Sequence, residues 1–129
     1  MDVETGKLET ISHISEMPTY EPGGHAGTLN IRLIEESFAG TYEMILGTVE
    51  PGGLAETHYH GVESQAMYVI AGRAKVALGD DPAVEYGPGT IFRIPPGLDH
   101  YVESLGPEPL QVVIVYSPAI GTPPVYRGA

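Results

Sequence analysis

The sequence has no cysteine, few basic residues and no long apolar run. Without cysteine, disulfide bonds and thiolate metal sites are excluded. Only 6 basic residues stand against 17 acidic ones, and the net charge of -11 opposes binding to nucleic-acid phosphates or anionic membranes. The longest apolar run, VVIVY at 112–116, is too short to span a bilayer. The polar N-terminus has no signal-peptide pattern, so we expect a soluble cytoplasmic protein.

Glycine, proline and strand-forming residues are abundant instead. The chain has 17 Gly and 12 Pro in 129 residues, and 42% of its residues are hydrophobic. Turn clusters such as GDDP and PPGLD separate short runs rich in Val, Ile and Tyr. This pattern predicts one all-β domain, either a sandwich or a barrel. The expected strands are 28–34, 41–49, 55–60, 65–72, 73–78, 83–86, 90–94, 100–104 and 110–117.

We expect three parts within this one domain. Residues 1–27 form a turn-rich N-terminal arm, residues 28–118 form the β-barrel, and residues 119–129 form an extended, proline-rich tail. The segment TLNIRLIEESFAG at 28–40 also admits a short helix. Its β-branched residues and the glycine that follows favour a strand.

Two histidines separated by one residue are the most informative feature of the chain. Side chains at i and i+2 of a strand point to the same face, so His58 and His60 face the same way. The return strand places Gln65 near them, and His100 follows the sharp turn PPGLD. Three imidazoles and an amide oxygen suit a divalent first-row metal, and open positions on it would indicate a catalytic site.

These residues also fall on two spaced motifs. In GLAETHYHGVESQAMYVIAG the frame is Gly53, His58, His60, Gln65 and Gly72, and in GTIFRIPPGLDHYVES it is Gly89, Pro95, Gly97, His100 and Ser104. In both motifs the chain resembles a single-domain cupin of the RmlC-like superfamily. The resemblance implies a double-stranded β-helix, that is, a jelly-roll barrel of antiparallel sheets. It further implies that His58, His60, Gln65 and His100 bind zinc, nickel, iron or manganese.

The sequence departs from the cupin motifs at two positions. Gln65 stands where the first motif usually has a glutamate ligand, and Ser104 stands where the second usually ends in asparagine. An amide oxygen can coordinate a metal without neutralising its charge, which favours polarisation of a bound oxygen. The same substitution removes a carboxylate that could act as a general base. Cupins that linearise unsaturated uronate sugars resemble this pattern of His, His, Gln and His.

Several alternatives remain open at this stage. The barrel could keep the fold without the metal, and Gln65 could support the ligands without binding the metal itself. Glu63 could swing in as a ligand, although a charged turn residue is usually solvated. We expect His13 and His25 to be surface or interface residues.

Other candidate site residues flank the histidines. Met67, Val69 and Phe92 are expected to form an apolar wall of the substrate pocket, or simply to pack in the core. Tyr116 could reach the cavity mouth and act on substrate as an acid or base, although a strand tyrosine by default only packs. Arg93 could hold a substrate carboxylate, but an outward, solvated arginine is favoured.

Three functions are consistent with this sequence. The favoured one is a redox-neutral enzyme that uses a divalent metal as a Lewis acid, of the lyase, isomerase or cyclase type, on an oxygenated carbonyl- or carboxylate-containing small molecule. The second is an iron-dependent dioxygenase, and the third is a small-molecule-binding module without catalysis. The resemblance to cupins also implies a homodimer.

Overall fold

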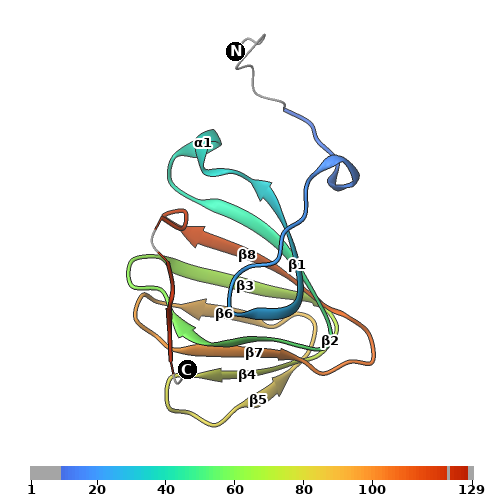
Figure 1. Cartoon of the computed structure of the whole chain (residues 1–129), viewed down its shortest axis with the longest axis vertical. Coiled ribbons are helices and arrows are strands. Elements are labelled where there is room, and N and C mark those ends of the chain that lie inside the picture. Colours follow the sequence, from blue (N-terminus) through green and yellow to red (C-terminus); the bar gives the residue numbers. More distant parts are fainter. Residues whose placement is uncertain (1–9, 122, 128–129) are drawn as a thin grey trace.

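Strands form almost all of the regular structure (Figure 1). Buried and more exposed residues alternate along most of them. The computed structural model describes residues 10–121 and 123–127. The strands are β1 (His25–Ile34), β2 (Glu43–Tyr59), β3 (Ser64–Ala71), β4 (Ala74–Leu78), β5 (Val84–Tyr86), β6 (Ile91–Ile94), β7 (His100–Ser104), β8 (Leu110–Ser117) and β9 (Val125–Tyr126). A 3-10 turn, η1 (Ile14–Glu16), and one helical turn, α1 (Glu36–Ala39), complete the described elements.

All strand pairs are antiparallel, in the order β5-β4-β7-β2-β8-β3-β6, and β1 and β9 both pair with β2. Figure 1 shows this sheet curled on itself, with β8, β3 and β6 stacked above β7 and β4. The predicted all-β barrel is therefore confirmed. None of the helices in the described residues has the length and apolar character needed to cross a membrane.

Strand β2 belongs to both walls of the barrel: the larger wall consists of β1, β2, β8, β3 and β6, and the smaller wall of β2, β7, β4 and β5. The first half of β2, up to Val49, pairs with β8, and its second half, from Leu54, pairs with β7. The prediction of separate strands at 41–49 and 55–60 was wrong, because β1 pairs with both halves of β2, on either side of a break in register that includes Pro51 and Gly52. This long strand delivers His58 to the barrel interior.

The expected strand in the segment 28–40 is present, but it begins earlier, at His25. The short helix considered as an alternative for this segment is present only as the single turn α1, which is followed by Gly40 in the left-handed conformation. The early start of β1 has a functional consequence, since it brings part of the predicted N-terminal arm into the barrel wall.

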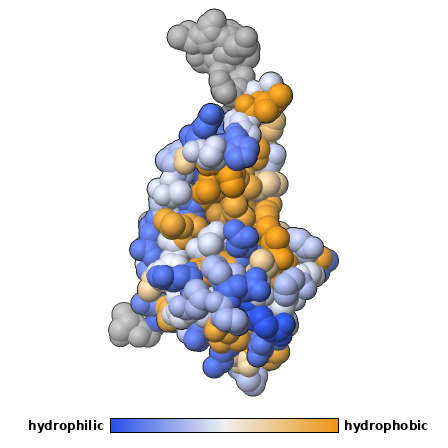
Figure 2. Space-filling view, turned by 90° about the vertical axis from the view of Figure 1, so that its right-hand side faces the viewer, coloured by the Kyte–Doolittle hydropathy of each residue, from blue (hydrophilic) through white to orange (hydrophobic). Residues whose placement is uncertain are grey.

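The core lies between the two walls. Alternate side chains of β2, β3 and β8 point inward, as the pattern of period two requires. Val69 and Leu110 are fully buried there, and Met67, Val112 and Ile114 belong to the same apolar cluster. Apolar residues also reach the surface, and Figure 2 shows them gathered in the upper half of the face in view.

Candidate metal centre and cavity

Three histidines meet inside the barrel. His58 lies near the end of β2, His60 follows that strand, and His100 begins β7, where it pairs in register with His58. The ring centroids are 5.0 Å apart for His58 and His60, 4.2 Å for His58 and His100, and 5.4 Å for His60 and His100. One nitrogen of each ring lies within 4.8 Å of the others, and all three residues are buried. The structure thus brings together the three histidines that the sequence singled out.

Backbone carbonyls orient two of these rings. His58 Nδ1 lies 2.6 Å from the carbonyl oxygen of Glu56, and His100 Nδ1 lies 3.1 Å from that of Leu98. A carbonyl oxygen only accepts hydrogen bonds, so Nδ1 must donate and Nε2 keeps its lone pair. This is the usual arrangement of metal-binding histidines, in which the outer nitrogen is fixed by a second partner.

Burial keeps the imidazoles neutral. Burial, followed by the charge of His58, lowers the pKa of His60 and of His100 to about 4. Burial also lowers the pKa of His58, against the opposing effect of its bond to Glu56. Metal ligands must be deprotonated, so these rings are in the required state at neutral pH.

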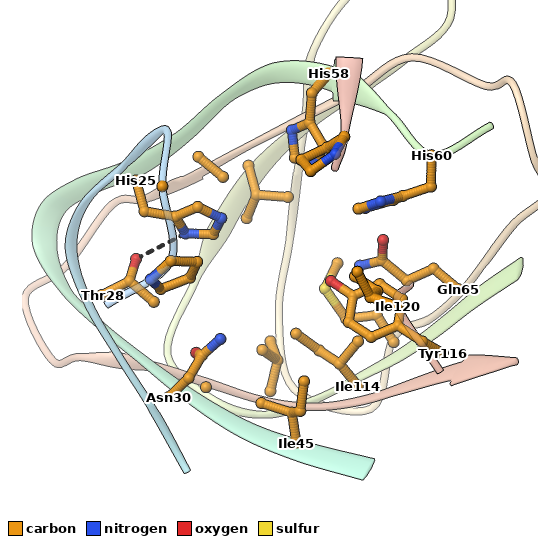
Figure 3. Close-up of a pocket in the computed structure, with 18 of the residues that line it drawn as sticks. His25, Thr28, Asn30, Ile45, His58, His60, Gln65, Ile114, Tyr116 and Ile120 are labelled. Carbon is orange, nitrogen blue, oxygen red and sulfur yellow. Dashed lines mark hydrogen bonds between the residues drawn. The ribbon is translucent and has the colours of Figure 1, made fainter. Parts of the chain in front are cut away.

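Gln65 completes the polar group. It lies on β3, is buried and lines the same cavity. Figure 3 shows its amide directed toward His60. Its Oε1 has no hydrogen-bond partner among the described residues, and the same holds for His60 Nε2 and His100 Nε2. Buried polar atoms without partners are destabilising, and neutral nitrogen and oxygen donors of this kind fit a divalent transition metal.

Glu63 does not lie where the sequence suggested. The expectation of a solvated carboxylate was wrong, because Glu63 is buried and its Oε2 accepts a hydrogen bond of 3.1 Å from the backbone of Gly121. It is outside the group of residues that could hold a metal. The C-terminal tail covers the turn that carries Glu63, and this explains its burial. The sequence gave no reason to place the tail there.

A cavity of about 470 Å³ extends from the histidines into the barrel. Its floor is apolar and includes Ile45, Met67 and Ile114. Tyr116 also lines it, with its ring 5.2 Å from that of His60. Burial raises the pKa of Tyr116 well above its ordinary value, so its hydroxyl retains its proton. The volume is in the range of small-molecule sites in proteins.

The other predicted pocket residues lie elsewhere. Val69 and Phe92 point inward but sit in the core beyond the cavity, where the Phe92 ring packs edge-on against Tyr86. Arg93 is exposed on β6 opposite Ala66, the outward direction that was favoured, and this position removes it from the cavity. Of the three predicted apolar wall residues, only Met67 lines the cavity.

His25 is a cavity residue that the sequence interpretation missed. The expectation that it lies on the surface or at an interface was wrong, because it is partly buried and its ring lies 6.4 Å from that of His58. Burial, then the charge of His58, lowers the pKa of His25 to about 4. The sequence signal for this position was Gly27, a residue that tolerates the φ of 75° found at this break in the β1–β2 register. Such a bulge turns His25 and Thr28 to the same side of the strand.

The C-terminal tail closes one side of the site. Strand β9 pairs with His58 and Tyr59, and the ring of Tyr126 lies 5.2 Å from that of His58. The hydroxyl of Tyr126 donates a hydrogen bond to the carbonyl of Gly23. Glu43 accepts a hydrogen bond of 3.0 Å from the backbone of Ile120. The tail is extended, as predicted from its prolines, but the sequence did not predict its contact with His58.

Comparison with known proteins agrees with this geometry. Residues 45–116 match the family model described as "Cupin domain". The chain is 32% identical over 80 residues to oxalate decarboxylase OxdC of Bacillus subtilis (strain 168), which covers 59% of this chain and 21% of that protein. It therefore spans about a fifth of the length of this curated relative.

Two solved structures illustrate the shared fold. The polyketide cyclase RemF from Streptomyces resistomycificus superposes with a TM-score of 0.82 at 20% identity, over 95% of this chain and 87% of that one. KdgF from Halomonas sp. superposes with a TM-score of 0.69 at 21% identity, over 81% of this chain and 90% of that one. At these identities the similarity concerns the fold, and the predicted jelly-roll barrel is confirmed by it.

Proposed function

We propose that this chain, which belongs to the cupin domain family, is a metal-dependent enzyme that acts on an oxygenated small molecule without net oxidation. The main observation in support is that three buried imidazoles converge at one end of a largely apolar cavity. In this proposal His58, His60 and His100 hold the metal and Gln65 is the fourth ligand. A structural role for these polar residues would leave several buried nitrogen and oxygen atoms without partners.

The neutral ligand set determines the kind of chemistry that we propose. A divalent metal bound here would supply Lewis acidity toward a carbonyl or carboxylate oxygen. Imidazole and amide ligands carry no charge, so they leave the positive charge of the site undiminished. A glutamate at position 65 would reduce that charge and add a base beside the substrate.

Tyr116 is our candidate for the residue that assists the reaction. It projects from β8 into the cavity, and Figure 3 shows it on the same side as Gln65 and His60. Its hydroxyl holds its proton because burial raises its pKa. We infer that Tyr116 Oη donates a hydrogen bond to the substrate oxygen on which negative charge develops. Such a donor stabilises the transition state more than the ground state.

The cavity favours a substrate with an apolar body. Arg32 is the one cationic side chain of the described cavity lining, and its Nε lies 2.9 Å from Glu43 Oε1. A small dianion such as oxalate would therefore have the metal as its counter-charge and no unpaired cationic side chain of the lining beside it. The similarity in fold to a polyketide cyclase supports a substrate with several carbonyl groups, and a cyclisation or related lyase or isomerase reaction. The distant curated relative is an oxalate decarboxylase, and its activity is not carried over.

Metal exchange under argon tests this function. Zinc-, nickel- and iron-loaded protein would be incubated with a panel of aromatic and aliphatic 1,3-dicarbonyl compounds, and products followed by mass spectrometry. We expect zinc-loaded protein to form products of unchanged oxidation level without oxygen. Turnover restricted to iron and accompanied by oxygen uptake would instead support a dioxygenase. Binding of these compounds without turnover would support a binding module.

We also propose that the protein is a homodimer, formed through the outer face of its larger wall. One apolar row crosses five neighbouring strands in register: Ile31, Leu46, Val113, Tyr68 and Ile91. Tyr68 and Ile91 are 47% and 55% exposed, which is unusual for large apolar side chains aligned in a row. Light scattering after size exclusion should give twice the chain mass of 13.7 kDa. Val113→Lys should shift the protein to the monomer, and a monomeric parent protein would contradict the proposal.

A further inference from the structure

The buried amide of Asn30 is not used by the site described so far. Asn30 lies on β1, lines the cavity and is only 6% exposed. Its Oδ1 has no hydrogen-bond partner within the described part of the chain. Asparagine is disfavoured in strands, and a buried amide oxygen without a partner is destabilising, so an apolar residue would stabilise the fold better. The position therefore indicates a function other than stability.

The surrounding backbone makes room for this amide and fixes it. Asn30 pairs with Gly47 on β2, and a Cβ at Gly47 would lie 3.0 Å from Asn30 Oδ1. A side chain at position 47 would thus displace the amide. The backbone N–H and C=O of Asn30 both bond to Tyr20, at 2.8 and 3.0 Å. The amide is consequently held on a rigid strand, which is how binding groups are positioned for recognition.

Asn30 belongs to a polar strip on the wall away from Gln65. The bulge at Gly27 turns His25 and Thr28 to the cavity, and His25 Nδ1 lies 3.1 Å from Thr28 Oγ1. In Figure 3 these residues lie on one side of the cavity, while His60, Gln65 and Tyr116 lie on the other. The nitrogen of the Asn30 amide points into the open space between them. Apolar side chains, among them Ile45 and Ile114, separate the two polar regions.

We propose that Asn30 binds a hydroxyl group at the far end of the substrate, separated by an apolar body from the oxygen held at the histidines. A hydroxyl can donate to the unpartnered Asn30 Oδ1 and accept from its Nδ2, whereas a carbonyl could only accept. This inference rests on the proposed function and narrows its substrate class to elongated, uncharged molecules with oxygen at both ends. A neutral group is indicated because the amide carries no charge and Arg32, the cation of the lining, is already paired with Glu43. A carboxylate at this end would lack a counter-charge.

Matched pairs of probes test this subsite. The probes are phenol against hydroquinone, and 2-naphthol against 2,6-dihydroxynaphthalene, which differ within each pair by one distal hydroxyl. Dissociation constants would be measured by calorimetry for the parent protein and for Asn30→Leu, which replaces the amide by an apolar group of similar size. Asn30→Ala is the second variant, because it adds no steric demand. Ser104→Ala is the control, since Ser104 is also buried with an unpartnered hydroxyl but lies outside the cavity lining.

In at least one pair, the parent protein and Ser104→Ala should bind the probe with the distal hydroxyl about three- to tenfold more tightly than the probe without it, as expected for one net hydrogen bond. This preference should disappear in both Asn30 variants. Equal or undetectable binding of both probes by the parent protein, or a preference that persists without the amide, would overturn the proposal. The titrations would be repeated after chelation. Loss of the metal site changes both probes of a pair alike, so failure of the proposed enzyme function is distinguishable from failure of the subsite.

Discussion

His100→Ala is expected to abolish metal retention. His100 is one of only three histidines that converge in the buried group, and its ring is held by the carbonyl of Leu98. Loss of an outer-sphere partner already weakens metal binding by about 10- to 100-fold, so loss of a direct ligand should exceed about 100-fold. Metal content after dialysis, measured by plasma mass spectrometry, gives the result directly. His58→Ala should behave in the same way.

Two further variants make this result specific. His13→Ala removes an exposed histidine that bonds to Ser15, and it should retain the full metal content of the parent protein. Gln65→Ala should retain metal with weakened affinity, because three imidazoles remain. Full metal content in both His58→Ala and His100→Ala would refute the assignment of the ligands.

Tyr116→Phe is expected to lower kcat about 100-fold while metal content and KM change little. The variant removes one hydroxyl from the cavity wall and keeps the ring that packs against His60. Loss of a single hydrogen-bond donor to a developing negative charge typically lowers kcat by about 10²- to 10³-fold. Steady-state kinetics on any substrate found with zinc-loaded protein provides the measurement.

Tyr101→Phe is the matched control for this experiment. Tyr101 is adjacent to a proposed ligand, but its hydroxyl bonds to Glu103 and its side chain is outside the cavity lining. Its kcat should stay within about twofold of the parent value, as expected for a surface substitution. Equal activity of Tyr116→Phe and the parent protein would exclude a catalytic role for the Tyr116 hydroxyl.

The convergence of His58, His60 and His100 was predictable because it depends on local rules and a familiar pair of motifs. Strand periodicity places His58 and His60 on one face, and the turn before His100 returns the chain to them. Periodicity predicts which face of a strand a side chain is on, but not whether that side chain lines the cavity or packs in the core. Val69 shares a face with Met67, yet one packs in the core and the other lines the cavity.

The misplaced residues depend on contacts between distant segments. His25 enters the cavity at the bulge beside Gly27, where the register of β1 on β2 changes by an odd number of residues, and such a change reverses the direction of every side chain before it. Glu63 is buried by the C-terminal tail, whose Gly121 is 58 positions away. Strand periodicity and turn motifs carry little information about such pairings.

The most direct test of the metal centre is the metal content of protein purified without chelators or a metal-binding tag. The convergence of His58, His60 and His100 predicts a near-stoichiometric divalent metal in each chain. Zinc or nickel would agree with redox-neutral chemistry, and iron would make oxygen uptake the next assay. Protein that contains no metal, even after reconstitution with each of these ions, would contradict the account.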